Sequence, residues 1–318
     1  MGTEFDRNIF HGYLVKGDVA EVIRYLAQFP QQAELYRKYI SVFEKEEYVM
    51  YEVDDVLNGI LLVYQKYYRD VFYLHVDEEK AATVMRNRFV DFFGMDNPES
   101  QLSEIEEHEI SEVFQRRGFH FLGGKTGGYW GPYIWKTTES TTYDVELPDG
   151  RQLFPISFLD GFITKGWCDY VSFGEISAGG WTDGDGIIHC VKSSYDFEDE
   201  SFTVSLLKHE AQHAMDLTQY KSMSSEDLEY RAKLVELIYS YKRNLLKQFI
   251  HEADTSNANN GHSLASNRIL EEFTKRVHRD RQELCMLPIE EIQAVSVGLL
   301  ASSNEEIKKK YGQLTPTV

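Results

Sequence analysis

The sequence predicts an α+β protein, with a helical N-terminal region, a small mixed β-sheet region and a helical C-terminal region. Residues 8–115 carry apolar side chains mostly at helical spacing, whereas residues 119–196 are rich in glycine, aromatic and β-branched residues. From Phe202 onward the helical spacing returns. We therefore expect two groups of helices with strands between them.

Helix start and stop signals recur in the N-terminal region. Asp18 is placed to cap a helix that Pro30 ends, and Gly94 ends a later helix. The helix that follows Asn97 is strongly acidic, which is typical of a solvated face rather than a site. Helices are expected at residues 18–29, 31–45, 53–73, 78–93 and 97–118.

The central region consists of short apolar segments separated by turn residues. A hairpin is predicted where Pro148, Asp149 and Gly150 lie between two such segments. Another short strand is expected directly before the next helix. The expected strands cover residues 133–138, 141–147, 152–156 and 187–191.

The C-terminal region is expected to return to helices. The first helix has neither glycine nor proline from Phe202 to Tyr220. A polar gap at residues 254–262 interrupts the region. The expected helices cover residues 202–220, 226–248, 263–283 and 289–311.

The change in composition at Gly118 predicts a domain boundary. We expect a helical N-terminal domain at residues 1–117 and a second domain at residues 118–318. The second domain is expected to have a β-rich part, 118–200, and a helical part, 201–318.

The charge of the chain argues against some classes of partner. Its 33 basic and 52 acidic residues give a net charge of −19, whereas nucleic acids and anionic membranes bind basic surfaces. A G-K-T sequence at residues 124–126 lacks the spacing of a phosphate-binding loop, and the glycines and proline after it forbid the required helix. Nucleotide binding is therefore not expected.

Cysteine content and the N-terminus bear on the cellular compartment. The three cysteines are far apart and predict neither a disulfide framework nor a paired metal site. The first residues are polar and show no secretory signal, and the apolar runs are too short to span a bilayer. We therefore expect a cytoplasmic protein. The sequence gives no indication of its oligomeric state.

The helix at residues 202–220 contains the sequence H-E-x-x-H, formed by His209, Glu210 and His213. Two histidines four residues apart lie on the same helix face, where their imidazoles can bind one metal ion. Glu210 lies between them, near enough to act on a water at that metal. The sequence therefore predicts a metal site on this helix.

This stretch resembles the zincin metallopeptidases over residues 202–240. Metzincins continue the motif with a glycine and a third histidine, but this chain has Asp216 and Gln219 at those positions. The gluzincin branch instead takes a glutamate from the following helix. That resemblance implies Zn²⁺ as the cofactor, held by two histidines and a glutamate.

Three glutamates of the following helix are candidates for the third ligand. Glu229 is preferred, because the small Ala232 three residues later lets the two helices approach closely and because E-x-x-A resembles the gluzincin segment. Glu236 is the first alternative, or a partner that orients a ligand histidine, and Glu226 is a weaker alternative. Lys233 stands where thermolysin-like gluzincins carry a supporting aspartate.

The resemblance implies a zinc-dependent peptidase in which Glu210 is the general base. A tyrosine or histidine is then expected to stabilise the developing oxyanion, and Tyr195 and Tyr230, close in sequence to the site elements, are the candidates. By the same resemblance, residues 187–193 are the candidate edge strand for pairing with a peptide substrate, and a plain core strand is the alternative for this segment. The aminopeptidase segment G-x-M-E-N is absent from the sequence, which favours cleavage of internal bonds.

Two other functions remain open at this point. The chain is alternatively a catalytically silent zincin-like scaffold that binds a peptide or protein, although the intact Glu210 argues against this. The third hypothesis is a helical interaction protein with a structural metal. A structural zinc requires four protein ligands, and the sequence near the motif offers no evident fourth.

Overall fold

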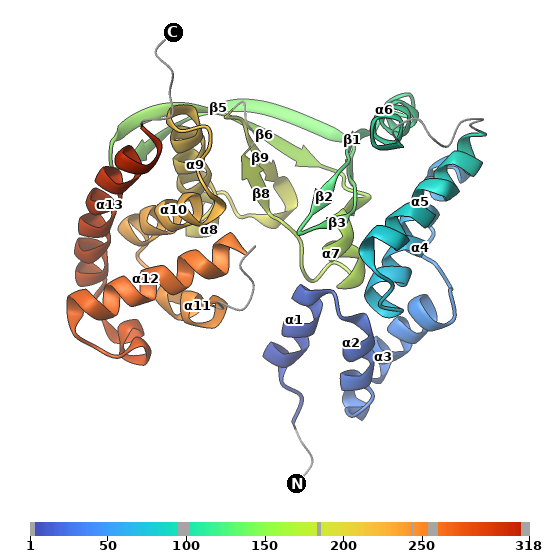
Figure 1. Cartoon of the computed structure of the whole chain (residues 1–318), viewed down its shortest axis with the longest axis horizontal. Coiled ribbons are helices and arrows are strands. Elements are labelled where there is room, and N and C mark those ends of the chain that lie inside the picture. Colours follow the sequence, from blue (N-terminus) through green and yellow to red (C-terminus); the bar gives the residue numbers. More distant parts are fainter. Residues whose placement is uncertain (1–3, 95–101, 183–185, 243, 254–259, 313–318) are drawn as a thin grey trace. The chain divides into compact units, whose positions relative to one another are not determined.

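The computed structural model describes residues 4–94, 102–182, 186–242, 244–253 and 260–312 (Figure 1). The chain is α+β and divides into two compact units, one formed by residues 1–137 and 160–178 and the other by residues 138–159 and 179–318. Among the described residues, no helix combines the length and the apolar character needed to cross a membrane.

The first unit is mainly helical. A buried aromatic and aliphatic core holds it together, with Tyr39, Phe43 and Tyr67 fully buried. Two helices, α3 and α4, end in a π-helical turn. Its helices are α1 (Arg7–Lys16), α2 (Val19–Leu26), η1 (Pro30–Gln32), α3 (Ala33–Tyr39), η2 (Ile40–Glu44), α4 (Asp55–Tyr68), η3 (Arg69–Tyr73), α5 (Glu78–Phe93), α6 (Leu102–Gln115) and α7 (Gly166–Val171).

Short strands complete the first unit. They are β1 (His120–Leu122), β2 (Lys125–Thr126), β3 (Tyr129–Trp130), β4 (Tyr133–Trp135) and β7 (Thr164–Lys165). Strands β1, β4 and β7 form one sheet, and β2 pairs with β3 around the G-K-T sequence. Trp130, Ile134 and Trp167 belong to the core of this unit. The contacts therefore place residues 118–137 with the N-terminal helices, which differs from the expected boundary at residue 117.

The second unit contains a four-stranded sheet and the C-terminal helices. The sheet order is β5-β6-β9-β8, with β9 parallel to β6 and antiparallel to β8. The unit comprises β5 (Thr137–Leu147), β6 (Gly150–Asp160), β8 (Gly180–Thr182), β9 (Ile188–Val191), η4 (Lys192–Ser194), α8 (Glu200–Thr203), α9 (Leu207–Gln219), α10 (Ser225–Tyr239), α11 (Asn244–Glu252), α12 (Gly261–Val277), η5 (Arg281–Met286) and α13 (Ile289–Tyr311).

The pairing of β9 decides between the two alternatives for residues 187–193, an edge strand for substrate and a plain core strand. The core strand holds, because β9 has hydrogen-bonded neighbours on both sides. The described strand at this edge of the sheet is β8, because it pairs with β9 alone. Local apolar character does not reveal strand order, which depends on the long-range pairing of β9 with β6.

Two expected helices are also shorter than predicted. The motif helix α9 begins at Leu207 rather than at residue 202, after a break that follows α8. The helix expected at residues 226–248 ends at Tyr239, because Ser240 adopts an extended conformation and its hydroxyl bonds Glu200 at 2.8 Å. Helix α10 packs against α9, α12 and α13, which encloses its two central turns.

Candidate metal centre

The two motif histidines meet on one face of α9. His209 and His213 are buried, and their ring centroids lie 4.6 Å apart with the rings nearly perpendicular. This face turns toward α10, which packs along α9. The four-residue spacing therefore brings both imidazoles to the same side of the helix, as the sequence predicts.

Glu229 of α10 completes a group of three possible metal ligands. Its Oε2 atom lies 3.4 Å from His209 Nε2, and its Oε1 atom lies 3.4 Å from His213 Nε2. Within the described parts of the chain, these three residues form the one cluster that could hold a metal ion. The residue preferred from the sequence is thus the carboxylate that the structure places with the histidines, and its role as a ligand stays a prediction.

The spacing within this group fits a zinc ion. Zinc takes histidine and carboxylate ligands at about 2.0–2.2 Å in a tetrahedron, so neighbouring ligand atoms lie about 3.3 Å apart. The two distances of 3.4 Å between Glu229 and the histidines match this separation, each from a different carboxylate oxygen, and one ligand atom from each residue lies within 4.8 Å of the others. The donor set of two imidazoles and one carboxylate is also the set used by catalytic zinc sites.

The charges of the three residues are strongly coupled. Burial opposes protonation of His209, but the carboxylates of Glu229 and Glu236 outweigh it and raise the pKa of this histidine. Burial also opposes ionisation of Glu229, yet contacts with His209, His213 and His262 hold its pKa well below the usual range. The ionised form of the Glu229 carboxylate is therefore favoured, and this is the form that can bind a cation.

Glu236 lies on the opposite side of His209 from Glu229. Its Oε1 atom is 2.7 Å from His209 Nδ1, and both side chains are buried. A histidine that binds a metal through one nitrogen usually donates its other N–H to such an acceptor. Glu236 thus occupies the place of an orienting partner. Glu226 is half-buried and lies outside the three-residue group.

The second ring nitrogen of His213 lacks the kind of partner that Glu236 provides for His209. His213 Nδ1 is buried and has no hydrogen-bond partner among the described residues. The side chain of Gln212, inside the motif, is likewise buried without a partner there. Of the two histidines, His209 is therefore the one whose orientation a protein side chain fixes.

Glu210 is held by a residue that the sequence did not indicate. The Oγ1 atom of Thr182, on strand β8, lies 2.7 Å from Glu210 Oε2 and 3.2 Å from the Glu210 carbonyl oxygen. Strand β8 packs on α9, where Gly180 lets it approach closely, because a Cβ there would clash with Leu206. Nothing in the local sequence of Thr182 marks it as a site residue.

The two tyrosines considered for oxyanion stabilisation lie in different surroundings. Tyr195 is partly buried, and burial together with the charges of Cys190, Glu210 and Glu236 raises its pKa. Tyr230 is buried in the core, and the guanidinium of Arg268 lies 4.0 Å from its ring centroid. Tyr195 is thus the tyrosine with electrostatic coupling to the motif, and its catalytic role stays a prediction.

His262 also lies at the site, although the sequence indicates only a polar gap at residues 254–262. Its Nδ1 atom lies 2.8 Å from Glu229 Oε2, and its ring is stacked on that of His209 with centroids 6.4 Å apart. It is the second residue of α12, far from the motif in sequence. No spacing rule links it to α9 or α10, so only the packed structure reveals it.

Buried ion pairs hold α10 in place beside α9. Arg231 Nε donates to Asp216 Oδ2 at 2.7 Å, and Arg231 Nη1 donates to Asn304 of α13, also at 2.7 Å. Lys233 Nζ donates to Glu252 Oε2 of α11 at 2.8 Å. These contacts fix the helix that carries Glu229 to three neighbouring helices.

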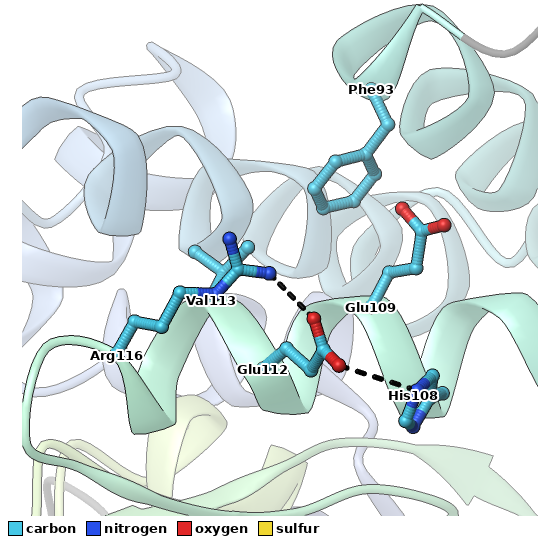
Figure 2. Close-up of a pocket in the computed structure, with 6 residues that line it drawn as sticks. All are labelled: Phe93, His108, Glu109, Glu112, Val113 and Arg116. Atoms are coloured by element: carbon cyan, nitrogen blue, oxygen red, sulfur yellow. Dashed lines mark hydrogen bonds and ion pairs between the residues drawn. The ribbon is translucent and has the colours of Figure 1, made fainter.

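A separate pocket lies between α5 and α6 of the first unit (Figure 2). It has a volume of about 480 Å³ and is lined by Phe93, His108, Glu109, Glu112, Val113 and Arg116. Glu112 is paired with Arg116 at 2.5 Å and with His108 at 3.4 Å. The pocket contains exposed, mutually paired charges, and it shows none of the convergent buried groups of the metal centre.

Comparisons with protein-family models, with curated proteins and with solved structures each gave no match. The interpretation of the site depends on the contacts described above.

Proposed function

We propose that the protein is a zinc-dependent metallopeptidase that hydrolyses peptide bonds with Glu210 as general base. The observation that carries the proposal is the buried group of His209, His213 and Glu229, assembled beside Glu210. Its donor types and its 3.4 Å separations fit zinc. The zincin-like character of the fold is part of this proposal.

Three candidate ligands meet among the described residues, which is the number expected of a catalytic zinc site, whereas a structural zinc would require four. When bound, zinc supplies Lewis acidity, which polarises a peptide carbonyl and lowers the pKa of a water molecule to about 7. In this proposal Glu210, which accepts a hydrogen bond from Thr182, would take a proton and pass it to the leaving amine.

The presence of Glu210 favours an enzyme over a silent binding scaffold. A groove that only binds a peptide has no need of a half-buried carboxylate oriented by a hydroxyl next to the metal ligands. We propose peptides or proteins as substrates, with cleavage at internal bonds.

Metal content tests the site directly. Protein purified without added metal should contain about one zinc per chain, and Glu229→Ala should lose most of it. Glu226→Ala is the matched control, because Glu226 lies one turn earlier on α10 and outside the group. Wild-type protein that neither contains nor takes up zinc would refute the proposal.

Hydrolysis tests the reaction. Zinc-loaded wild type should cleave fluorescently labelled casein or members of a peptide library. Glu210→Gln should reduce the rate by about 10²- to 10⁴-fold while keeping the zinc, because the amide cannot accept the proton. Stoichiometric zinc with no hydrolysis of any peptide tested, and peptide binding equal in wild type and Glu210→Gln, would instead support a binding scaffold.

A further inference from the structure

We propose that His262 is a positioning residue that fixes the carboxylate of Glu229 in the metal centre. This inference rests on the proposed zinc site. His262 lies on α12, whereas the motif lies on α9 and the candidate third ligand, Glu229, lies on α10.

The contact between His262 and Glu229 is the first observation. His262 Nδ1 lies 2.8 Å from Glu229 Oε2, which is within ion-pair distance, although this buried oxygen has no partner with hydrogen-bond geometry among the described residues. This nitrogen donates in the protonated ring and in the Nδ1–H form of the neutral ring. The same Oε2 atom lies 3.4 Å from His209 Nε2, so one carboxylate oxygen is shared between two imidazoles.

The distances argue against His262 as a fourth ligand. The contact of His262 with the three-residue group is to a carboxylate oxygen of Glu229, at 2.8 Å. His262 also lies outside the group of ligand atoms that are close enough to share one ion. Its place beside Oε2 therefore suits an ion-pair partner of the Glu229 carboxylate.

The chain places His262 through a close helix contact. Asn260 caps α12 by accepting a hydrogen bond from Ser263 N at 3.1 Å. Gly261 is buried against the first turn of α10, where a Cβ would clash with the side chain of Ser225. Only glycine allows this approach, which brings the next residue over Glu229, one turn further along α10.

His262 is well suited to substitution because its side chain is 56% exposed, whereas that of Glu229 is 11% exposed. Its replacement removes a contact at the rim of the site without opening a cavity in the core. Loss of a side chain that orients a metal ligand commonly weakens metal binding by about 10- to 100-fold. We expect a change of this size.

The experiment measures zinc affinity by chelator competition on the full chain. His262→Ala and His262→Gln should bind zinc about 10- to 100-fold more weakly than wild type. His262→Asn should bind close to wild type, because its amide nitrogen and histidine Nδ1 are the same number of bonds from Cα. His251→Ala is the control, since His251 is an exposed histidine of α11 in the same unit.

A spectroscopic measurement separates positioning from packing. With Co²⁺ in place of zinc, the visible absorption of His262→Ala should differ from wild type, and that of His262→Asn should not. Circular dichroism and thermal unfolding of the metal-free proteins should be unchanged. If His262→Ala binds zinc as tightly as wild type, or if His262→Asn is as weak as His262→Ala, the role of His262 is refuted and the zinc site stands. Absence of zinc from the wild-type protein would refute both the role of His262 and the proposed zinc site.

Discussion

The Nδ1 atom of His209 and the Oε1 atom of Glu236 lie 2.7 Å apart in the interior of the second unit. Glu229, which lies two turns before Glu236 on α10, is close to Nε2, the other nitrogen of the His209 ring. One helix thus supplies both a candidate ligand and the group that orients a neighbouring ligand.

Replacement of Glu236 tests this division of roles. Glu236→Ala should weaken zinc binding by about 10- to 100-fold, because His209 loses the acceptor that fixes its orientation. Glu236→Gln keeps an acceptor oxygen and should lose less. The measurement is chelator competition. If Glu236→Ala abolishes zinc binding while Glu229→Ala keeps it, Glu236 is the third ligand instead.

Removal of the Thr182 hydroxyl should lower kcat/KM for peptide hydrolysis and leave the zinc content unchanged. Thr182→Val has nearly the same shape but cannot bond Glu210, and hydrogen bonds to charged groups contribute about 1.5–3 kcal/mol. The expected loss is roughly 10- to 100-fold in kcat/KM, with zinc content unchanged.

Thr182→Ser retains the hydroxyl and is the control for this prediction. Steady-state kinetics and metal analysis on the same samples decide the result. Equal kcat/KM in wild type and Thr182→Val would show that Glu210 is positioned without the hydroxyl.

The buried pair of Asp216 and Arg231 should be important for stability. Arg231→Leu leaves the Asp216 carboxylate buried without its ion-pair partner, which should lower the free energy of unfolding by about 3–5 kcal/mol. The double variant with Asp216→Leu should be less affected than the sum of the two single variants. Urea unfolding of the four proteins measures this coupling, and additive effects would contradict it.

The sequence predicts the parts of the site that depend on local spacing. The four-residue spacing predicts that His209 and His213 share one helix face. Glu229 is preferred as the third ligand because the small Ala232 allows close helix packing. Ala232 is indeed fully buried. Each of these inferences uses one helix or two consecutive ones, so no knowledge of long-range packing is required.

The remaining parts depend on contacts between distant segments. Thr182 reaches Glu210 because β8 pairs with β9, and His262 reaches Glu229 because Gly261 brings α12 against α10. Strand β9 pairs with β6 on one side, across more than thirty residues of sequence, and this leaves β8 at the edge on its other side. Neither the composition nor the periodicity of these segments contains that information.

The position of two glutamates on one continuous helix constrains how the chain can change in length. Glu229 and Glu236 are separated by about two turns, since an α-helix has about 3.6 residues per turn. One residue inserted between them would rotate one carboxylate by about 100° relative to the other, so that both could no longer flank the His209 ring. We expect insertions to be tolerated in the connection between α9 and α10, but the number of residues from Glu229 to Glu236 should be invariant.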